Sequence, residues 1–155
     1  RTDRHTFAFI ILVWKYGCFI RNKTLGVAYK IMYQSKSWPD AIEACEQEGA
    51  QIAVPRSEFD FMQKLVRGMS HPNITNSEYK LVVWLGISNL DDYRTWKTVY
   101  GRYWGRTTKL FYDSNGQIGI DAPEEPHCAG LDAMNPGLRE FWCHRRQPFL
   151  CEINI

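Results

Sequence analysis

The chain has 155 residues, of which 45% are hydrophobic and 14% aromatic, and its formal net charge is +2. A chain of this length folds most economically as one domain around one core. The small net charge argues against nucleic-acid binding driven by bulk charge. The five cysteines favour an oxidising compartment, and hence a secreted, extracellular protein. Their spacing matches no zinc site, because no Cys-x-x-Cys motif occurs.

Near its start the chain contains an unbroken apolar run, Phe7–Trp14. The run is far shorter than the roughly 20 residues that a membrane helix needs, so no membrane span is predicted there. Its β-branched and aromatic residues favour a strand, which packs on its own domain or pairs with another subunit. Cys18 follows closely and is the best candidate for the odd thiol, either unpaired or bonded to another chain. Residues 7–18 are therefore a candidate contact in a homo- or hetero-oligomer.

Residues 27–34 alternate in a way that predicts a strand. A helix is predicted to follow, with Ser37 as its N-cap and Gly49 at its end. The apolar face of this helix consists of Trp38, Ala41, Ile42 and Cys45. Cys45 thus points into the core, which makes it the natural distant partner for Cys151.

After a short strand at residues 51–54, Ser57 is expected to cap a second helix. Residues 81–87 are too continuously apolar for a surface strand and are predicted to be buried on both faces. Residues 88–127 show little regular pattern, and loops of that length are uncommon unless they are functional or disordered. The second helix has an apolar stripe that we assign to the core: Phe61, Met62, Leu65, Val66 and Met69.

Three of the five cysteines lie in the C-terminal segment Cys128–Cys151, which also holds the turn signal Asn135-Pro136-Gly137. If the strands on either side of this turn pair, Cys128 and Cys143 come near the ends of neighbouring strands. The pattern predicts three short strands in this segment, at residues 128–134, 138–143 and 148–153.

Two sequons, which begin at Asn22 and Asn73, predict N-glycosylation. Together with the cysteines they favour a secreted glycoprotein. Asn73 lies in the polar segment 70–80, which is expected to be an exposed loop.

Several motifs occur together and in order along the chain, and through them it resembles the C-type lectin-like domain over residues 27–153. The resemblance implies an α+β fold with two helices, small antiparallel sheets and a long irregular ligand loop. It also implies the disulfides Cys45–Cys151 and Cys128–Cys143, and it divides the chain into an N-terminal extension (1–26) and a lectin-like domain (27–155). The motifs are Tyr29-Lys30, Trp38-x-x-Ala41-x-x-x-Cys45, Gly49-Ala50-x-Ile52-Ala53-x-Pro55-x-Ser57, Phe61, Trp84-Leu85-Gly86-Ile87, Trp96 and the last three cysteines.

Sugar-binding members of that family hold calcium through Glu-Pro-Asn or Gln-Pro-Asp in the long loop and Trp-Asn-Asp before the third cysteine. Here the Trp-Asn-Asp positions read Leu138-Arg139-Glu140, and neither loop motif occurs between Trp96 and Cys128. Calcium takes about six to eight oxygen ligands, whereas Arg139 stands where an amide ligand is expected. We therefore expect no cofactor and no calcium-dependent sugar site. The weak candidates for an ion are Glu124, Glu125 and Glu140, and a solvated acidic turn is the simpler interpretation of the first two.

Aromatic residues alternate with cations where the family keeps its ligand loop. Trp, Tyr and Arg are frequent anchors at protein interfaces, and the same mixture suits a sulfated or carboxylated glycan. The alternatives are a core role for the aromatic residues and a solvated surface for the cations. His144-Arg145-Arg146 is a second small basic patch, for which a solvated turn is the simpler interpretation. The predicted ligand-binding residues are Tyr100, Arg102, Tyr103, Trp104, Arg106 and Lys109, with Glu124, Glu125 and Glu140.

The sequence thus predicts a secreted recognition module that binds a protein or a glycoconjugate without calcium. It predicts no enzyme, because no Gly-x-Ser-x-Gly or His-Glu-x-x-His motif occurs. Two alternatives stay open. One is a structural subunit of a multi-chain extracellular complex, held through the 7–14 strand and Cys18. The other is a calcium-dependent carbohydrate-binding lectin with an atypical site.

Overall fold

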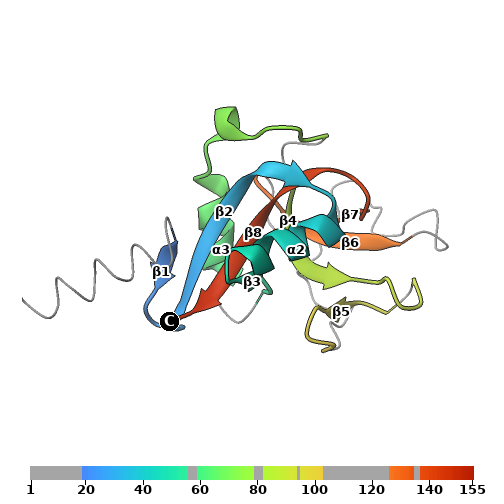
Figure 1. The fold of residues 1–155 in the computed structure, drawn as a ribbon, viewed down its shortest axis with the longest axis horizontal. Helices are drawn as coiled ribbons and strands as arrows, with labels where there is room; N and C mark the ends of the chain where they lie inside the picture. The colour runs from blue at the N-terminus through green and yellow to red at the C-terminus, as the bar shows by residue number, and fades with distance from the viewer. Residues whose placement is uncertain (1–18, 56–58, 79–81, 94, 103–125, 135–136) are drawn as a thin grey trace, which may run out of the picture.

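A computed structural model of the chain describes residues 19–55, 59–78, 82–93, 95–102, 126–134 and 137–155 (Figure 1). The strand expected at 7–14, Cys18 and the expected cap Ser57 lie outside these residues. None of the described helices is both long enough and apolar enough to cross a membrane. In chain order the elements are β1 (Ile20–Asn22), β2 (Val27–Lys36), α2 (Trp38–Gln47), β3 (Gln51–Ile52), α3 (Phe59–Arg67), the 3₁₀-helix η1 (His71–Asn73), β4 (Val82–Ser88), β5 (Lys97–Thr98), β6 (His127–Asp132), β7 (Leu138–Trp142) and β8 (Gln147–Asn154).

The described strands form one sheet in the order β1-β2-β8-β4-β6-β7, with β3 added to β8 and β5 added to β4. β2 and β8 run side by side over most of their length, from Val27 opposite Asn154 to Met32 opposite Phe149 (Figure 1). β4 lies parallel to β8, with Trp84 opposite Phe149, while the other described pairs are antiparallel. Because β4 bridges β8 and β6, the expected small antiparallel sheets are joined into a single one.

The central strand β4 is buried on both faces, because its alternate side chains enter two different clusters. Val83, Leu85 and Ile87 pack in a cluster that includes Met62 and Val66 of α3. Val82 and Trp84 pack in a second cluster with Trp38, Ala41 and Cys45 of α2. The two helices therefore cover opposite faces of the sheet, and the two-sided burial predicted for this strand is confirmed for residues 82–87.

Helix α2 begins and ends where the sequence predicts. The Ser37 hydroxyl accepts a hydrogen bond from the Asp40 backbone N–H at 3.4 Å. Gly49 follows the helix with a φ of +71°, a conformation that glycine adopts at little cost. The Trp38 indole N–H donates to the Leu85 carbonyl at 2.7 Å, which fixes the start of α2 against β4.

Two disulfides join helices and strands of the described chain, one over a long and one over a short sequence distance. Cys45–Cys151 links α2 to β8, with a Cα–Cα distance of 5.5 Å. Cys128–Cys143 links β6 to the end of β7, with a Cα–Cα distance of 5.1 Å. These are the pairs that the family resemblance implies. With two helices and one sheet, they give a disulfide-stapled α+β fold.

The N-terminal hairpin crosses the boundary expected at residues 26 and 27, because β1 pairs with β2 from Ile20 opposite Tyr29 to Asn22 opposite Val27. Asn22 closes the turn of this hairpin. Its Oδ1 accepts hydrogen bonds from the backbone N–H groups of Thr24 at 3.1 Å and Leu25 at 3.3 Å. Asn22 is only 7% exposed, whereas the other sequon residue, Asn73, is exposed on η1. The asparagine side chains of the two sequons therefore differ in how accessible they are to glycosylation.

Candidate functional site

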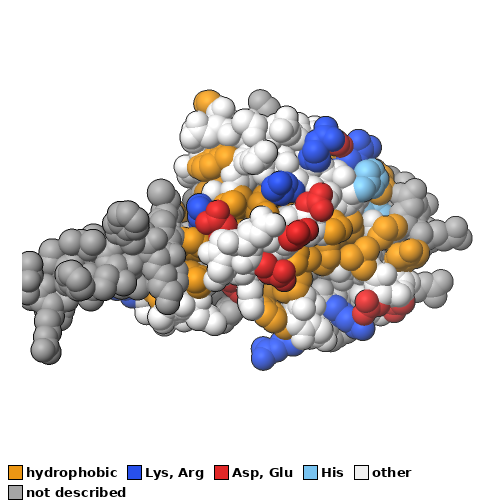
Figure 2. Space-filling model, viewed as in Figure 1, with side chains coloured by type: hydrophobic (Ala, Val, Ile, Leu, Met, Phe, Trp, Pro, Cys, Tyr) orange, Lys and Arg blue, Asp and Glu red, His pale blue; other side chains and the backbone are white. Residues whose placement is uncertain are grey.

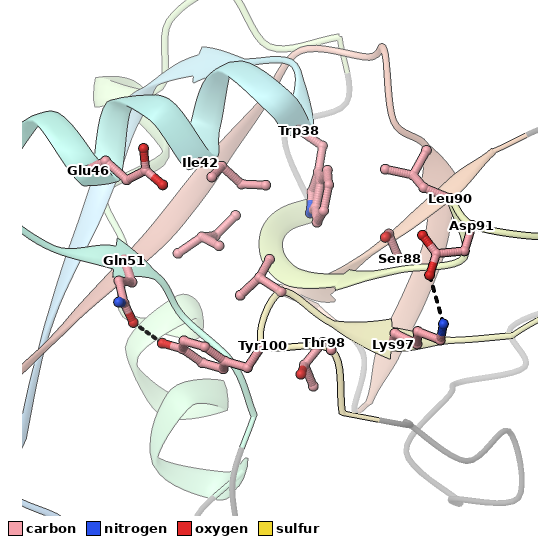
Figure 3. A pocket seen from close by; sticks show the side chains of 13 residues that line it. Trp38, Ile42, Glu46, Gln51, Ser88, Leu90, Asp91, Lys97, Thr98 and Tyr100 are labelled. Atoms are coloured by element: carbon pink, nitrogen blue, oxygen red, sulfur yellow. Dashed lines mark hydrogen bonds and ion pairs between the residues drawn. The ribbon is translucent and has the colours of Figure 1, made fainter.

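Three of the predicted ligand-binding residues lie in the described part of the chain: Tyr100, Arg102 and Glu140. Tyr100 is 46% exposed and directs its ring toward Gln51 (Figure 3). Its hydroxyl donates to the Gln51 Oε1, and the Glu152 Oε1 lies 3.5 Å from it. Tyr100 therefore extends over the edge where β3 meets β8. Six predicted residues lie outside the described residues: Tyr103, Trp104, Arg106, Lys109, Glu124 and Glu125.

Arg102 is exposed and closes the turn after β5 through its backbone. Its carbonyl accepts from the Thr98 N–H at 2.9 Å, and its own N–H donates to the Thr98 Oγ1 at 3.2 Å. Glu140 lies on β7 opposite Ala129. Because β7 is three strand positions from β8 in the sheet, Glu140 and the strand that Tyr100 contacts are roughly 14 Å apart. The structure therefore does not bring Tyr100 and Glu140 into one site.

Tyr100 instead forms one wall of a groove of about 550 Å³ between α2, β3 and residues 88–91 and 97–101. We call it the α2 groove. Trp38 occupies its centre, with Ile42 on one side and Leu90 on the other (Figure 3). Leu90 is 37% exposed, so the groove offers an apolar wall to solvent. The lining residues are Trp38, Ile42, Glu46, Gln51, Ile52, Ser88, Leu90, Asp91, Lys97, Thr98, Val99, Tyr100 and Gly101.

The rim of the α2 groove carries two carboxylates and one ammonium group, those of Glu46, Asp91 and Lys97. The Lys97 Nζ donates to the Asp91 Oδ2 at 2.8 Å. This hydrogen bond, together with the attraction of the same carboxylate, raises the pKa of Lys97. On this face of the molecule a band of hydrophobic side chains runs beside acidic side chains (Figure 2). The groove thus combines an apolar floor with a slightly acidic rim.

Asn89 holds the turn that carries Leu90 and Asp91, a role that the sequence patterns do not indicate. It is 3% exposed, and its Oδ1 accepts from the His127 N–H at 2.7 Å. Its own N–H donates to the His127 carbonyl at 3.0 Å, and its Nδ2 donates to the Tyr93 carbonyl at 3.1 Å. A single buried amide therefore ties the groove wall to β6.

The strand positions that correspond to Trp-Asn-Asp have a different chemistry in this chain. Leu138 is fully buried in the core. Arg139 forms an ion pair through its Nε with the Oδ2 of Asp132, whose side chain has no exposed surface. A guanidinium group supplies no oxygen ligand and repels a cation, so Leu138 and Arg139 do not fit a calcium site. Within the described part of the chain, no three His, Cys, Asp or Glu side chains gather as a metal site requires.

Comparison with known proteins assigns the family. A sequence model of the lectin C-type domain matches residues 34–153. The chain belongs to the C-type lectin domain family. It is 31% identical over 136 residues to the CD209 antigen of Pongo pygmaeus, a match that covers 81% of this chain and 30% of that protein. It is 25% identical over 139 residues to the secretory phospholipase A2 receptor of Mus musculus, covering 87% of this chain and 8% of the receptor.

The same C-type lectin fold recurs in solved structures at lower sequence identity. The carbohydrate-recognition domain of the mouse scavenger receptor C-type lectin superposes with a TM-score of 0.67 at 20% identity, covering 89% of this chain and 94% of that one. The trimeric Kupffer cell C-type lectin receptor Clec4f superposes with a TM-score of 0.66 at 14% identity, covering 97% and 92%. The chain spans less than a third of the length of the curated relatives named above. It thus corresponds to the ligand-binding recognition domain of this family, whose fold is typical of binding rather than of catalysis.

Proposed function

We propose that this C-type lectin domain recognises its ligand without calcium. The observation that supports this most directly is the ion pair between Arg139 and Asp132. In the sugar-binding pattern of the family an amide stands at the position of Arg139. Here that position holds a cation, and the cation uses the neighbouring buried carboxylate as its counter-charge. A calcium ion at this strand would have to displace Arg139 and leave its charge without compensation.

The ligand that best suits the α2 groove is a protein. Leu90 and Tyr100, which are 37% and 46% exposed, offer apolar and aromatic surface, of the kind that anchors protein interfaces. Lys97 compensates the charge of Asp91, so the rim keeps one net negative charge, which favours a partner segment that carries a basic side chain beside an apolar one. The groove thus supports an interface in which an apolar anchor is buried and a cation of the partner lies at the rim.

The domain is proposed to act outside the cell. Its two disulfides, Cys45–Cys151 and Cys128–Cys143, are of the kind that persist in oxidising compartments. The exposed sequon at Asn73 adds to this proposal, because sequons are modified in the secretory pathway.

Calcium independence is tested first by thermal unfolding of the purified domain with calcium, with EDTA and with neither. We expect the same melting temperature in all three conditions. A rise with millimolar calcium that EDTA reverses would overturn the proposal, since any ion that binds only the folded state stabilises it by mass action.

The protein ligand is tested by staining cells with a labelled tetramer of the domain in EDTA. We expect staining that protease treatment of the cells removes. Leu90→Arg should weaken staining by about tenfold or more, because it places a cation in the apolar wall beside the partner's own cation. Met134→Arg is the matched control, since Met134 is 65% exposed on the β6–β7 turn and lies outside the groove. Equal loss in both variants, or in neither, would count against the groove.

A carbohydrate ligand is the second candidate, because the similar mouse structure is described as a carbohydrate-recognition domain. A glycan array probed in calcium and in EDTA distinguishes a carbohydrate ligand from a protein ligand. Binding to neutral sugars that EDTA abolishes would favour a calcium-dependent lectin. Absence of binding to neutral sugars, together with cell staining that protease treatment removes, would favour the protein ligand.

A further inference from the structure

A second hollow adjoins the α2 groove, because Gln51 and Tyr100 line both. It has a volume of about 250 Å³ and lies between the turn that follows α2 and the end of β8. We call it the Glu152 hollow, and its walls include Gly49, Gln51, Tyr100, Glu152 and Asn154. Among the described residues, chain neighbours aside, none lies within 4 Å of the place that a Cβ at Gly49 would take. This wall therefore leaves room for a ligand.

Glu152 is an acidic residue of β8 that is only 3% exposed. It lies directly opposite Gln51 in the register of β3 and β8, which places the two side chains next to each other on one face of the sheet. The Tyr100 hydroxyl donates to the Gln51 Oε1 (Figure 3), and the Glu152 Oε1 lies 3.5 Å from the same hydroxyl. Three oxygen atoms, of an amide, a phenol and a carboxyl group, therefore meet where the two hollows adjoin.

These three oxygen atoms offer more acceptor sites than one hydroxyl proton can fill. A tyrosine hydroxyl carries a single proton, and here that proton goes to Gln51. An ammonium group has three N–H donors and no acceptor. It therefore matches a set of three oxygen atoms, one of which belongs to a carboxyl group.

The α2 groove favours a partner with a basic side chain, and the burial of the nearby carboxyl groups indicates where that side chain binds. Asp91 on the rim already accepts a hydrogen bond from Lys97 at 2.8 Å. Glu46 is exposed, so it attracts a cation but holds it weakly. A carboxylate as buried as that of Glu152 interacts with a cation more strongly, because little water screens the contact.

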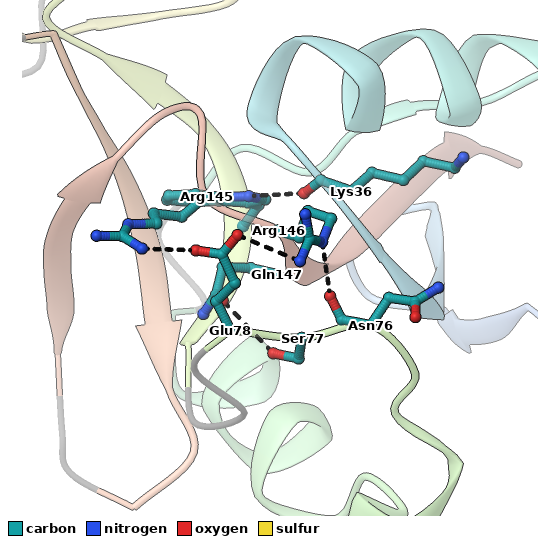
Figure 4. Close-up of polar contacts among 8 residues, drawn as sticks. Lys36, Asn76, Ser77, Glu78, Arg145, Arg146 and Gln147 are labelled. Carbon is teal, nitrogen blue, oxygen red and sulfur yellow. Dashed lines mark hydrogen bonds and ion pairs between the residues drawn. The ribbon is translucent and has the colours of Figure 1, made fainter.

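Glu78, beside the turn between β7 and β8, shows the opposite arrangement. Its carboxylate faces two guanidinium groups of the same chain (Figure 4). The Arg145 Nη1 donates to its Oε2 at 2.9 Å, and the Arg146 Nη2 lies 3.5 Å from its Oε1. Glu78 is thus matched within the chain, and it lines neither hollow. It is therefore no candidate for the cation of a partner.

We propose that the Glu152 hollow binds the ammonium group of a lysine side chain of the partner protein. This inference rests on the proposed protein ligand of the α2 groove and names its basic side chain. The lysine donates hydrogen bonds to the oxygen atoms of Gln51, Tyr100 and Glu152, while an apolar residue of the same partner segment packs in the α2 groove. Because the Tyr100 ring is 46% exposed, it can move aside as the lysine enters, and the aliphatic part of the lysine packs against it. A guanidinium group holds its donors in a rigid planar fork, which suits three oxygen atoms from different groups less well.

An NMR titration in EDTA tests the hollow with three probes: lysine, arginine and norleucine, each acetylated at its N-terminus and amidated at its C-terminus. Norleucine has the aliphatic chain of lysine without the ammonium group. We expect capped lysine at millimolar concentration to shift the backbone amide signals of Gln51, Tyr100 and Asn154. Capped arginine should bind more weakly, and capped norleucine should cause no shift.

Variants assign the binding to Glu152. Glu152→Gln should weaken lysine binding by about tenfold, because it removes the buried charge and keeps the shape of the side chain. Glu48→Gln is the matched control and should leave binding unchanged, since Glu48 is an exposed carboxylate that pairs with Lys30 and lines neither hollow. Gln51→Glu adds a carboxylate at an exposed position and should strengthen lysine binding by about threefold. A gain of this kind cannot come from misfolding.

Five outcomes of the titration would overturn the proposal. They are no shift with capped lysine, equal shifts with capped norleucine, tighter binding of arginine than of lysine, a Glu152→Gln variant that binds lysine as the native domain does, and a loss in Glu48→Gln as large as in Glu152→Gln.

Cell staining in EDTA distinguishes failure of this inference from failure of the proposed function. We expect a tetramer of Glu152→Gln to stain about tenfold more weakly than the native tetramer. Protease-sensitive staining that Leu90→Arg weakens and Glu152→Gln leaves unchanged would overturn the lysine contact and leave the protein ligand in place. Absence of protease-sensitive staining by the native tetramer would instead overturn the protein ligand, and the titration alone would then decide whether the hollow binds an ammonium group.

Discussion

Arg139 on β7 pairs its guanidinium with the carboxylate of Asp132 on β6, a side chain with no exposed surface. The two residues lie near the β6–β7 turn, where the register sets Gly130 opposite Arg139 and Leu131 opposite Leu138. Asp132 also closes this turn, because its Oδ1 accepts from the Met134 N–H at 2.7 Å. A buried carboxylate therefore holds the turn, and Arg139 supplies its counter-charge.

Replacing Arg139 by Met should destabilise the domain by about 3 kcal/mol, because Asp132 would remain buried without its counter-charge. Urea unfolding followed by circular dichroism measures the loss. The double variant Arg139→Met with Asp132→Asn should be less destabilised than the two single changes added together, since it removes both charges. An Arg139→Met variant as stable as the native domain would contradict the buried pair.

The two sequons should differ in occupancy when the domain is produced in glycosylating cells. Asn73 is exposed on η1 and should carry a glycan. Asn22 is 7% exposed, and its side chain closes the β1–β2 turn, so a glycan there would disrupt the hairpin. Treatment with an amidase that removes N-glycans should shift the mass by one glycan. Asn73→Gln should abolish that shift, and Asn22→Gln should leave it intact; an occupied Asn22 in folded protein would oppose this prediction.

The two disulfides should contribute unequally to stability. Cys45–Cys151 spans 106 residues and Cys128–Cys143 spans 15. In the chain-entropy model these loops correspond to about 4.8 and about 3.0 kcal/mol, because a longer closed loop restricts the unfolded chain more. Paired Cys→Ser variants of each bridge, compared in urea, measure the difference. A larger loss for the Cys128–Cys143 pair would show that strain or local packing outweighs loop entropy.

The carboxyl of Glu78 should titrate below its ordinary pKa of 4.5, because Arg145 donates a hydrogen bond to it. A lowered pKa in the folded state means that the contact stabilises the fold above pH 4.5 and that this contribution is lost as the pH falls through the folded value. Carbon-13 NMR of the Glu78 carboxyl gives the pKa directly. In Arg145→Gln the pKa should return toward 4.5, and an unchanged pKa would remove Arg145 as the cause.

Much of the fold follows from local sequence patterns. The face of Trp38, Ala41 and Cys45 has helical spacing, and the Ser37 cap and Gly49 mark its limits, so α2 is predictable from one short segment. The run 82–87 is apolar without interruption, which is the pattern of a strand covered on both faces. Such features depend on the side-chain pattern of one short segment, and a single sequence displays that pattern.

The binding surfaces depend on contacts between distant residues. Tyr100 is visible in the sequence as an aromatic residue of a ligand loop, but only the fold places it beside Gln51 and across from Trp38. Asn89 has no motif, because its role arises from hydrogen bonds to His127, 38 residues away.

The two helices and the buried central strand could be predicted from local side-chain patterns, and the family from motifs that occur together and in order. The pairing of Arg139 with Asp132, the burial of Asn22 and the contact of Arg145 with both Glu78 and Trp142 could not be predicted in this way. Burial and ion pairing depend on which residues meet in space, and residues far apart in the sequence leave no local pattern that shows their contact.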